Sequence, residues 1–197
     1  NGTQSNSVSS GSVSNIPYLD LALTNAAAYR QARLFYDTNS HTLAYFNDRT
    51  NVTVNIGEEM LVRGVNKTGA TITNGSIVTI SGAQGNRPKI VLAQSTTAQS
   101  STFDVVGVAT EDIANNEEGM VTVSGVVHDI NTDNWQVGSE LWLSTNAGQM
   151  STNPPADGYC RALVGVVLRA SAQVGDVLVL PRQAVRLTDI AGLTNAV

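Results

Sequence analysis

Short apolar runs follow turn glycines along much of this chain. A turn glycine, a small polar residue and a strand-like apolar run occur together three times, at residues 74–80, 137–143 and 174–180. Glycine supplies the positive φ that a tight turn often requires, and the apolar residues that follow suit a half-buried or buried strand. The pattern predicts a β-rich scaffold.

A second sequence repeat accompanies the first. The run Val106-Gly107-Val108-Ala109-Thr110 resembles Val164-Gly165-Val166-Val167-Leu168, and each run follows one of the first two turn–strand units. We interpret the core as a degenerate duplication. The repeats describe architecture and carry no chemistry.

Residues 52–183 form the predicted β-rich domain. Polar, glycine-rich and proline-rich segments divide it into short runs, as expected of turns. Strands are expected at 52–55, 60–65, 76–81, 89–93, 103–110, 119–127, 140–144, 161–170 and 176–180. About nine short strands at this spacing predict an all-β fold with a β-sandwich or barrel-like domain.

The segments outside this domain are expected to be extended. Residues 1–16 contain too few apolar side chains to pack alone, so 1–33 is predicted to be an extended or disordered anchoring arm, with a short helix within 17–34. Aromatic runs around a polar turn predict a β-hairpin over 34–51, which must dock on another surface because an isolated hairpin is marginally stable. Residues 184–197 resemble a connecting segment.

The composition agrees with an all-β class. Charged residues make up 14 % of the chain, compared with about 25 % in typical globular proteins. Ser, Thr, Asn, Gly and Gln replace the missing charge, and these residues suit strands and turns better than isolated surface helices. The chain begins without methionine, so we interpret it as a processed product or as part of something longer.

Charge and cysteine content exclude several classes of partner and chemistry. The net charge is −5 and no Lys/Arg cluster occurs, so no nucleic-acid partner is expected. No apolar run approaches the roughly 20 residues of a membrane span, so no membrane association is expected. Cys160 is the single cysteine and cannot form an intrachain disulfide; we interpret it as a core or strand residue rather than a nucleophile.

The sequence contains no recognisable catalytic, metal or cofactor site. His41 and His128 are far apart and lack partners at metal-ligand spacing. Adjacent carboxylate pairs such as Glu58-Glu59 and Glu117-Glu118 would point to opposite faces of a strand or into solvent. No Gly-x-Ser-x-Gly elbow or phosphate-binding loop occurs. We therefore expect no catalytic residues, no metal ligands and no cofactor.

The two tryptophans are predicted to lie in different environments. Trp142 lies in an apolar strand-like run and is predicted to pack in the core. Trp135 lies in the polar loop after residue 130 and is equally consistent with a loop anchor and a ligand contact. Trp135 is the one candidate ligand-contact residue.

A series of structural motifs resembles a known family. The motifs are Leu34-Phe35-Tyr36-Asp37, residues 55–63, 65–69, 72–75, 80–83 and 87–88, then 106–110, 112–113, 119–125, 131–132, 138–144 and 164–167. Over roughly residues 33–181 the chain resembles structural proteins of tailed bacteriophages, in particular the virion-proximal module of tail fibres and related appendages. The resemblance implies a non-enzymatic, β-rich virion protein, most often trimeric. Residues 187–190 resemble segments that lead into a further fibre domain.

Three functional hypotheses follow. The first is a homotrimeric appendage component, assembled in the bacterial host cytoplasm, whose N-terminal arm docks on tail, neck or capsid proteins while the β-domain organises a fibre. The second is a capsid-decoration or head-fibre protein, or a carbohydrate-binding adhesin that contacts the host through Trp135. The third, an enzyme such as a tailspike glycosidase or esterase, ranks last.

Overall fold

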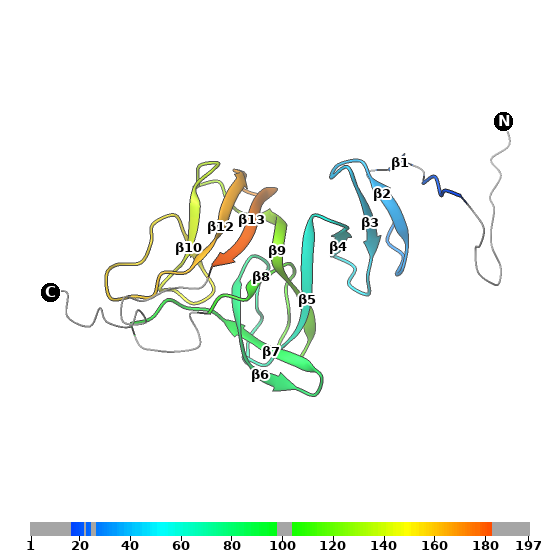
Figure 1. Cartoon of the computed structure of the whole chain (residues 1–197). Coiled ribbons are helices and arrows are strands. Elements are labelled where there is room, and N and C mark those ends of the chain that lie inside the picture. The colour runs from blue at the N-terminus through cyan, green and yellow to red at the C-terminus, as the bar shows by residue number, and fades with distance from the viewer. Residues whose placement is uncertain (1–16, 22, 25–26, 98–103, 183–197) are drawn as a thin grey trace.

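The computed structural model describes residues 17–21, 23–24, 27–97 and 104–182. Every regular element in these residues is a β-strand, so the predicted all-β class is confirmed for the described part of the chain. Figure 1 shows two groups of strands, a small sheet near the N-terminus and a larger assembly formed by the rest of the chain. The expected disorder of residues 1–16 and the linker at 184–197 lie outside the described residues.

The larger sheet accounts for most of the predicted strands. It contains β5 (Glu59–Asn66), β6 (Ile77–Gln84), β7 (Arg87–Leu92), β8 (Gly107–Ala109), β9 (Glu118–Ile130), β10 (Glu140–Leu143), β11 (Met150–Ser151), β12 (Leu163–Arg169) and β13 (Gly175–Arg182). The strand order is β11-β10-β12-β13-β9-β5-β7-β6-β8. Each strand predicted after residue 59 overlaps one of these. The two-residue strand β11 is too short for its pattern to predict it.

Five of the nine strands of this sheet form a closed ring. Strand β8 pairs with β9 as well as with β6, so β9, β5, β7, β6 and β8 form a closed ring. Strands β13, β12, β10 and β11 continue outward from β9 as an open sheet. One buried apolar cluster joins β6, β7, β8 and β9 of the ring, and a second joins β6, β8 and β9 to the open sheet. The domain thus combines barrel-like closure with sandwich-like packing.

The predicted duplication is visible in the strand order and register. The orders β7-β6-β8-β9 and β11-β10-β12-β13 are the same, and the two units meet where β9 pairs with β13. In the first unit Val78 lies opposite Gly107, and in the second Leu141 lies opposite Gly165. The residues that echo one another in the sequence therefore occupy equivalent positions in the fold.

The turns that precede β6 and β10 make equivalent backbone hydrogen bonds. Gly75 N–H donates to the carbonyl of Ala109 at 2.8 Å, and Gly138 N–H donates to that of Val167 at 2.8 Å. Gly75 and Gly138 have φ values of 81° and 85°, as a tight turn requires.

The third glycine of the sequence pattern has a different role. Gly175 lies in β13 itself and is not among the glycines with positive φ. A Cβ at this position would lie 2.0 Å from Thr132 Oγ1. The prediction of a turn glycine at this position is therefore wrong, because close approach of the chain is what requires glycine here.

The small sheet contains four strands. They are β1 (Leu23–Thr24), β2 (Leu34–Asp37), β3 (Thr42–Phe46) and β4 (Thr53–Asn55), in sequence order. Strands β2 and β3 form an antiparallel hairpin, with Leu34 opposite Tyr45. Strand β4 pairs with β3, so residues 53–55 belong to this sheet and not to the larger one.

The helix predicted within 17–34 is absent from the described residues of that range. Those residues form β1, a turn and extended backbone. Ala32 has a φ of 66°, its N–H donates to the carbonyl of Phe46 at 2.8 Å, and the carbonyl of Arg33 accepts from Phe46 N–H at 3.0 Å. Pairing with β3 uses backbone groups that a helix would need, so tertiary contacts override the local helix propensity.

Alanine substitutions test the equivalence of the two units. A Cβ at Gly107 would lie 2.2 Å from the carbonyl oxygen of Thr122, and one at Gly165 would lie 2.0 Å from that of Leu178. We expect Gly107→Ala and Gly165→Ala each to lower the free energy of unfolding by about 3 kcal/mol or more. Gly138→Ala meets no atom within 4 Å and should cost about 1–2 kcal/mol of backbone strain. Urea titration measures all three, and equal losses would contradict the packing argument.

Candidate interaction surface

The small sheet has very little core of its own. Its buried apolar cluster consists of Phe35, Ala44 and Phe46, with Ala27 packed against it. The rings of Phe35 and Phe46 lie 4.8 Å apart, and that of Tyr29 lies 5.4 Å from Phe46. A cluster of this size cannot support an isolated sheet, since small sheets need an apolar face packed on another layer.

Apolar side chains occur on both faces of this sheet. Neighbouring residues of a strand point to opposite faces, so Phe35 and Ala44 share one face while Leu34 and Tyr45 share the other. A strand that is apolar at nearly every position is typical of a sheet covered on both sides. The described residues cover only part of the sheet, because both Leu34 and Tyr45 remain exposed.

The segment that precedes β2 also carries exposed apolar side chains. Tyr18, Leu19 and Leu23 have 75 %, 65 % and 72 % of their surface exposed. We call the following set the N-terminal apolar surface: Tyr18, Leu19, Leu23, Tyr29, Leu34 and Tyr45. Such a concentration of exposed apolar side chains marks an interaction site more often than an ordinary surface.

An ion pair joins the small sheet to the larger domain. Arg49, in the loop between β3 and β4, donates from Nε to the Glu111 carboxylate at 2.9 Å. Glu111 is buried and also accepts from the Met120 N–H of β9 at 3.0 Å. A buried carboxylate is costly without partners, so the pair fixes the loop on the domain.

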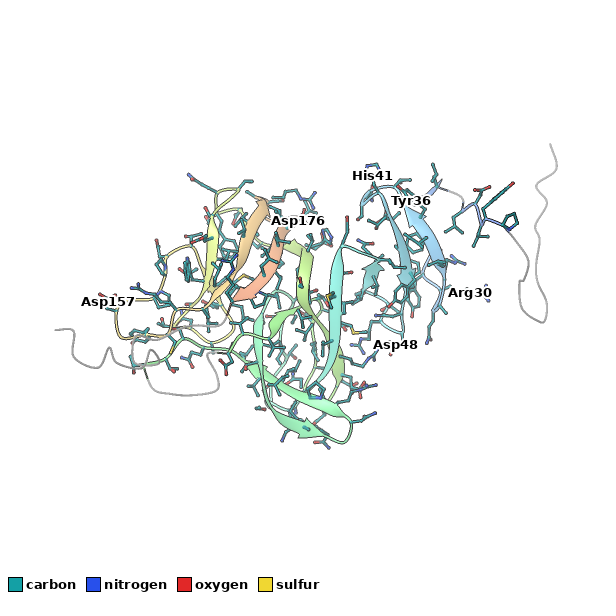
Figure 2. All side chains as sticks on the ribbon, in the orientation of Figure 1. Arg30, Tyr36, His41, Asp48, Asp157 and Asp176 are labelled. Carbon is teal, nitrogen blue, oxygen red and sulfur yellow. The ribbon has the colours of Figure 1, made fainter. Side chains whose placement is uncertain are left out.

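Two further contacts lie along the same junction. Arg63 of β5 forms an ion pair with Asp48, and Figure 2 shows Asp48 at the side of the small sheet that faces β5. The side-chain hydrogen bond from Arg63 lowers the pKa of Asp48. Glu59 accepts from the Asn55 N–H at 3.0 Å. Burial raises the pKa of Glu59 even though the Asn55 N–H opposes the shift.

A polar cleft of about 310 Å³ opens between the two sheets. Its lining includes Asp37 and Ser40 from the small sheet and Glu59 and His128 from the larger one. His128 Nδ1 lies 2.8 Å from Asp176 Oδ1, and Arg169 Nε lies 2.8 Å from Asp176 Oδ2. Asp176, labelled in Figure 2, therefore joins His128 and Arg169.

The cleft does not assemble a recognisable catalytic centre in the described residues. No serine, threonine or cysteine there hydrogen-bonds to His128, so the His128–Asp176 pair lacks a nucleophile. Within the same residues, no group of three His, Cys, Asp or Glu side chains has a geometry that could hold a metal ion. His41 lies in the β2–β3 turn, where its carbonyl accepts from Tyr36 Oη. Sequence spacing gives no signal for the His128–Asp176 contact.

The two tryptophans occupy different environments. Trp142 lies on β10 between the fully buried Leu141 and Leu143, and is only half-buried. Its predicted place in the core is wrong, because strand alternation turns it to the other face. Trp135 lies in the β9–β10 loop, packs partly against the core and lines a shallow pocket of about 370 Å³. It thus combines a loop-anchoring contact with access to solvent.

Comparison with known proteins identifies one family. The model of a family described as phage cement protein matches residues 57–183, about two thirds of the chain. No curated protein matches the sequence. Among the described residues, no helix has the length and apolar composition to cross a membrane. The matched region starts just after β4 and contains every strand of the larger sheet.

Breaking the junction ion pair should destabilise the protein. Arg49→Met leaves Glu111 buried with only the Met120 N–H as partner, and we expect the free energy of unfolding to fall by about 2 kcal/mol. Glu111→Gln in the same chain should recover much of this loss, since no charge is then left buried. Asp157→Asn, which removes a solvent-exposed pair with Arg161, is the control and should change little. Equal urea midpoints for Arg49→Met and Asp157→Asn would contradict the role of the pair.

The Glu59 carboxyl should make stability depend on pH. Because its folded-state pKa is raised, its contribution to stability is full below its ordinary value of 4.5 and is lost as pH rises through the folded-state pKa. Glu59→Gln keeps an acceptor for Asn55 and cannot ionise. We expect this variant to be more stable than the wild type at pH 7, with the difference disappearing below pH 4.5. Urea midpoints across this range measure it, and a variant less stable at pH 7 would show the sign to be wrong.

Proposed function

Because this chain belongs to the phage cement protein family and is therefore a structural protein of the phage virion, we propose that it binds neighbouring shell proteins and stabilises the particle. In this proposal the protein is non-enzymatic and needs no cofactor. The β-domain, residues 52–183 without β4, is the folded body, and the N-terminal apolar surface makes the attachment.

The observation that carries this proposal is the apolar character of both faces of the small sheet. Leu34 and Tyr45 are exposed on one face, while Phe35 and Phe46 form a minimal cluster on the other. Exposure of this kind costs stability unless a partner covers it in the assembled state. A neighbouring virion protein, or another copy of this chain, would supply that cover.

We propose that each segment of the chain has a separate role in attachment. Residues 1–33 act as an anchoring arm, the 34–51 hairpin with β4 forms the docking sheet, the rest of 52–183 forms the β-domain, and 184–197 leads onward as a linker. The junction contacts of Arg49 and Arg63 support this division, because they hold the docking sheet at one position on the β-domain. A fixed position lets one chain contact two neighbours with defined spacing.

We further propose that the protein is a homotrimer assembled in the host cytoplasm before or during particle assembly. A trimer would cover one face of each docking sheet with a neighbouring copy and leave the other face for the particle. A tail-fibre role, which the sequence motifs predict, remains the second candidate. The family description favours the shell, because cement refers to holding a structure together.

Add-back to particles tests the attachment surface. Particles produced without this protein are mixed with purified wild type or with the variant Tyr18→Ser/Leu19→Ser/Leu23→Ser, whose altered residues are exposed. We expect the variant to stay folded and to bind at least about tenfold more weakly, since apolar area is lost from the contact. Val137→Ser/Val174→Ser, two exposed apolar residues of the β-domain, is the matched control and should bind normally.

The same particles test the stabilising role. Bound wild type should raise the temperature at which the particles release their genome, because a ligand that binds only the intact shell stabilises it. Binding without any change in this temperature, together with restored adsorption to host cells, would instead support a fibre. Normal binding of the triple variant would contradict the attachment surface.

A further inference from the structure

A pocket around Trp135 lies at the meeting point of the two duplicated units. The Thr73–Ser76 turn before β6 lines it from the first unit, and Gln149, before β11, lines it from the second. Trp135 and Asn131 come from the loop that joins the units after β9. Its volume of about 370 Å³ lies within the roughly 300–1,000 Å³ of small-molecule sites.

The hydrogen-bonding groups of this pocket are largely free. The side-chain amide of Asn74, the Nδ2 of Asn131, the Nε2 of Gln149 and the indole N–H of Trp135 form no hydrogen bond with any described residue. Thr73 and Ser76 hydroxyls lie 3.0 Å apart and add further donors and acceptors. Planar amides and hydroxyls that converge beside one aromatic ring match the alternating hydroxyl and C–H surfaces of a sugar.

The charge of the pocket narrows the ligand class. None of the ten lining residues carries a charge. An acidic sugar would lose water without gaining a cationic partner, which is unfavourable. An uncharged sugar makes no such demand.

The ring itself is held in place by the fold. Trp135 packs partly against the larger apolar core, and its backbone N–H donates to the Thr132 carbonyl at 3.0 Å. Thr132 is buried and its hydroxyl donates to the Arg169 carbonyl at 2.7 Å. A pre-positioned ring loses little conformational entropy on binding.

From this arrangement we propose that the Trp135 pocket binds a neutral hexose unit of a glycan. The ring of Trp135 stacks on the sugar's C–H face, and Asn74, Asn131 and Gln149 bond its hydroxyls. This binding goes beyond attachment to the particle and does not depend on it, so a virion carrying the protein would gain contacts to a sugar-coated surface.

The chain's two tryptophans make the test direct. Each gives one indole N–H signal in a nitrogen–proton NMR spectrum, and Trp142→Phe assigns which is which. The purified protein is titrated with glucose, galactose, mannose, rhamnose and N-acetylglucosamine, and with glucuronic acid as the charged comparison. We expect at least one neutral sugar to shift the Trp135 signal saturably while the Trp142 signal stays in place.

Variants of the exposed pocket residues keep the test independent of folding. Asn74→Ala and Gln149→Ala alter exposed side chains and should each weaken sugar binding about fivefold. Trp135→Ala should abolish binding, and Trp142→Phe is the control that should retain it. No shift with any neutral sugar, equal shifts of both indoles, or a stronger response to glucuronic acid would each overturn the proposal. Particle add-back of Trp135→Ala should remain normal, which separates this site from the attachment surface.

Discussion

Strand β9 (Glu118–Ile130) is the element on which the rest of the structure depends. It pairs with β5 and β8 in the closed ring and with β13 in the open sheet. Strand β9 therefore belongs to the first duplicated unit and joins it to the second. Gly125, with a φ of 113°, lies opposite Glu59 of β5 and Val179 of β13, where β9 passes from one unit to the other. Its Met120 N–H also holds Glu111, the carboxylate that pairs with Arg49 of the small sheet's loop. Figure 1 shows β9 running through the centre of this arrangement.

Much of the fold could be predicted from the sequence, because strand periodicity and turn chemistry are local signals. The repeats at 74–80 and 137–143 and the two Val-Gly echoes mark equivalent strands. Local signals fail where distant contacts decide the structure. Ala32 pairs with Phe46 in place of a helix, and Gly175 is required by the neighbouring Thr132. Trp142 shows that an apolar run on one strand still has two faces.

The contacts that form the candidate sites are harder to predict from the sequence than the strands are. The contacts Arg49–Glu111 and His128–Asp176 join residues 62 and 48 positions apart, and no spacing rule indicates them. Trp135 was visible as a candidate, but its amide neighbours Asn74 and Gln149 come from separate units. The sequence itself shows that residues 34–36 are apolar at every position, and hence on both faces of a strand. The meaning of this pattern depends on the structure, which leaves Leu34 and Tyr45 exposed.

We propose that this phage cement protein attaches to the virion shell through the N-terminal apolar surface. Difference electron cryomicroscopy of particles with and without the protein would locate it on the virion. We expect extra density on the capsid shell, with Tyr18, Leu19 and Leu23 buried against a neighbouring protein. Density confined to the tail, or density on the shell with these three side chains facing solvent, would contradict it.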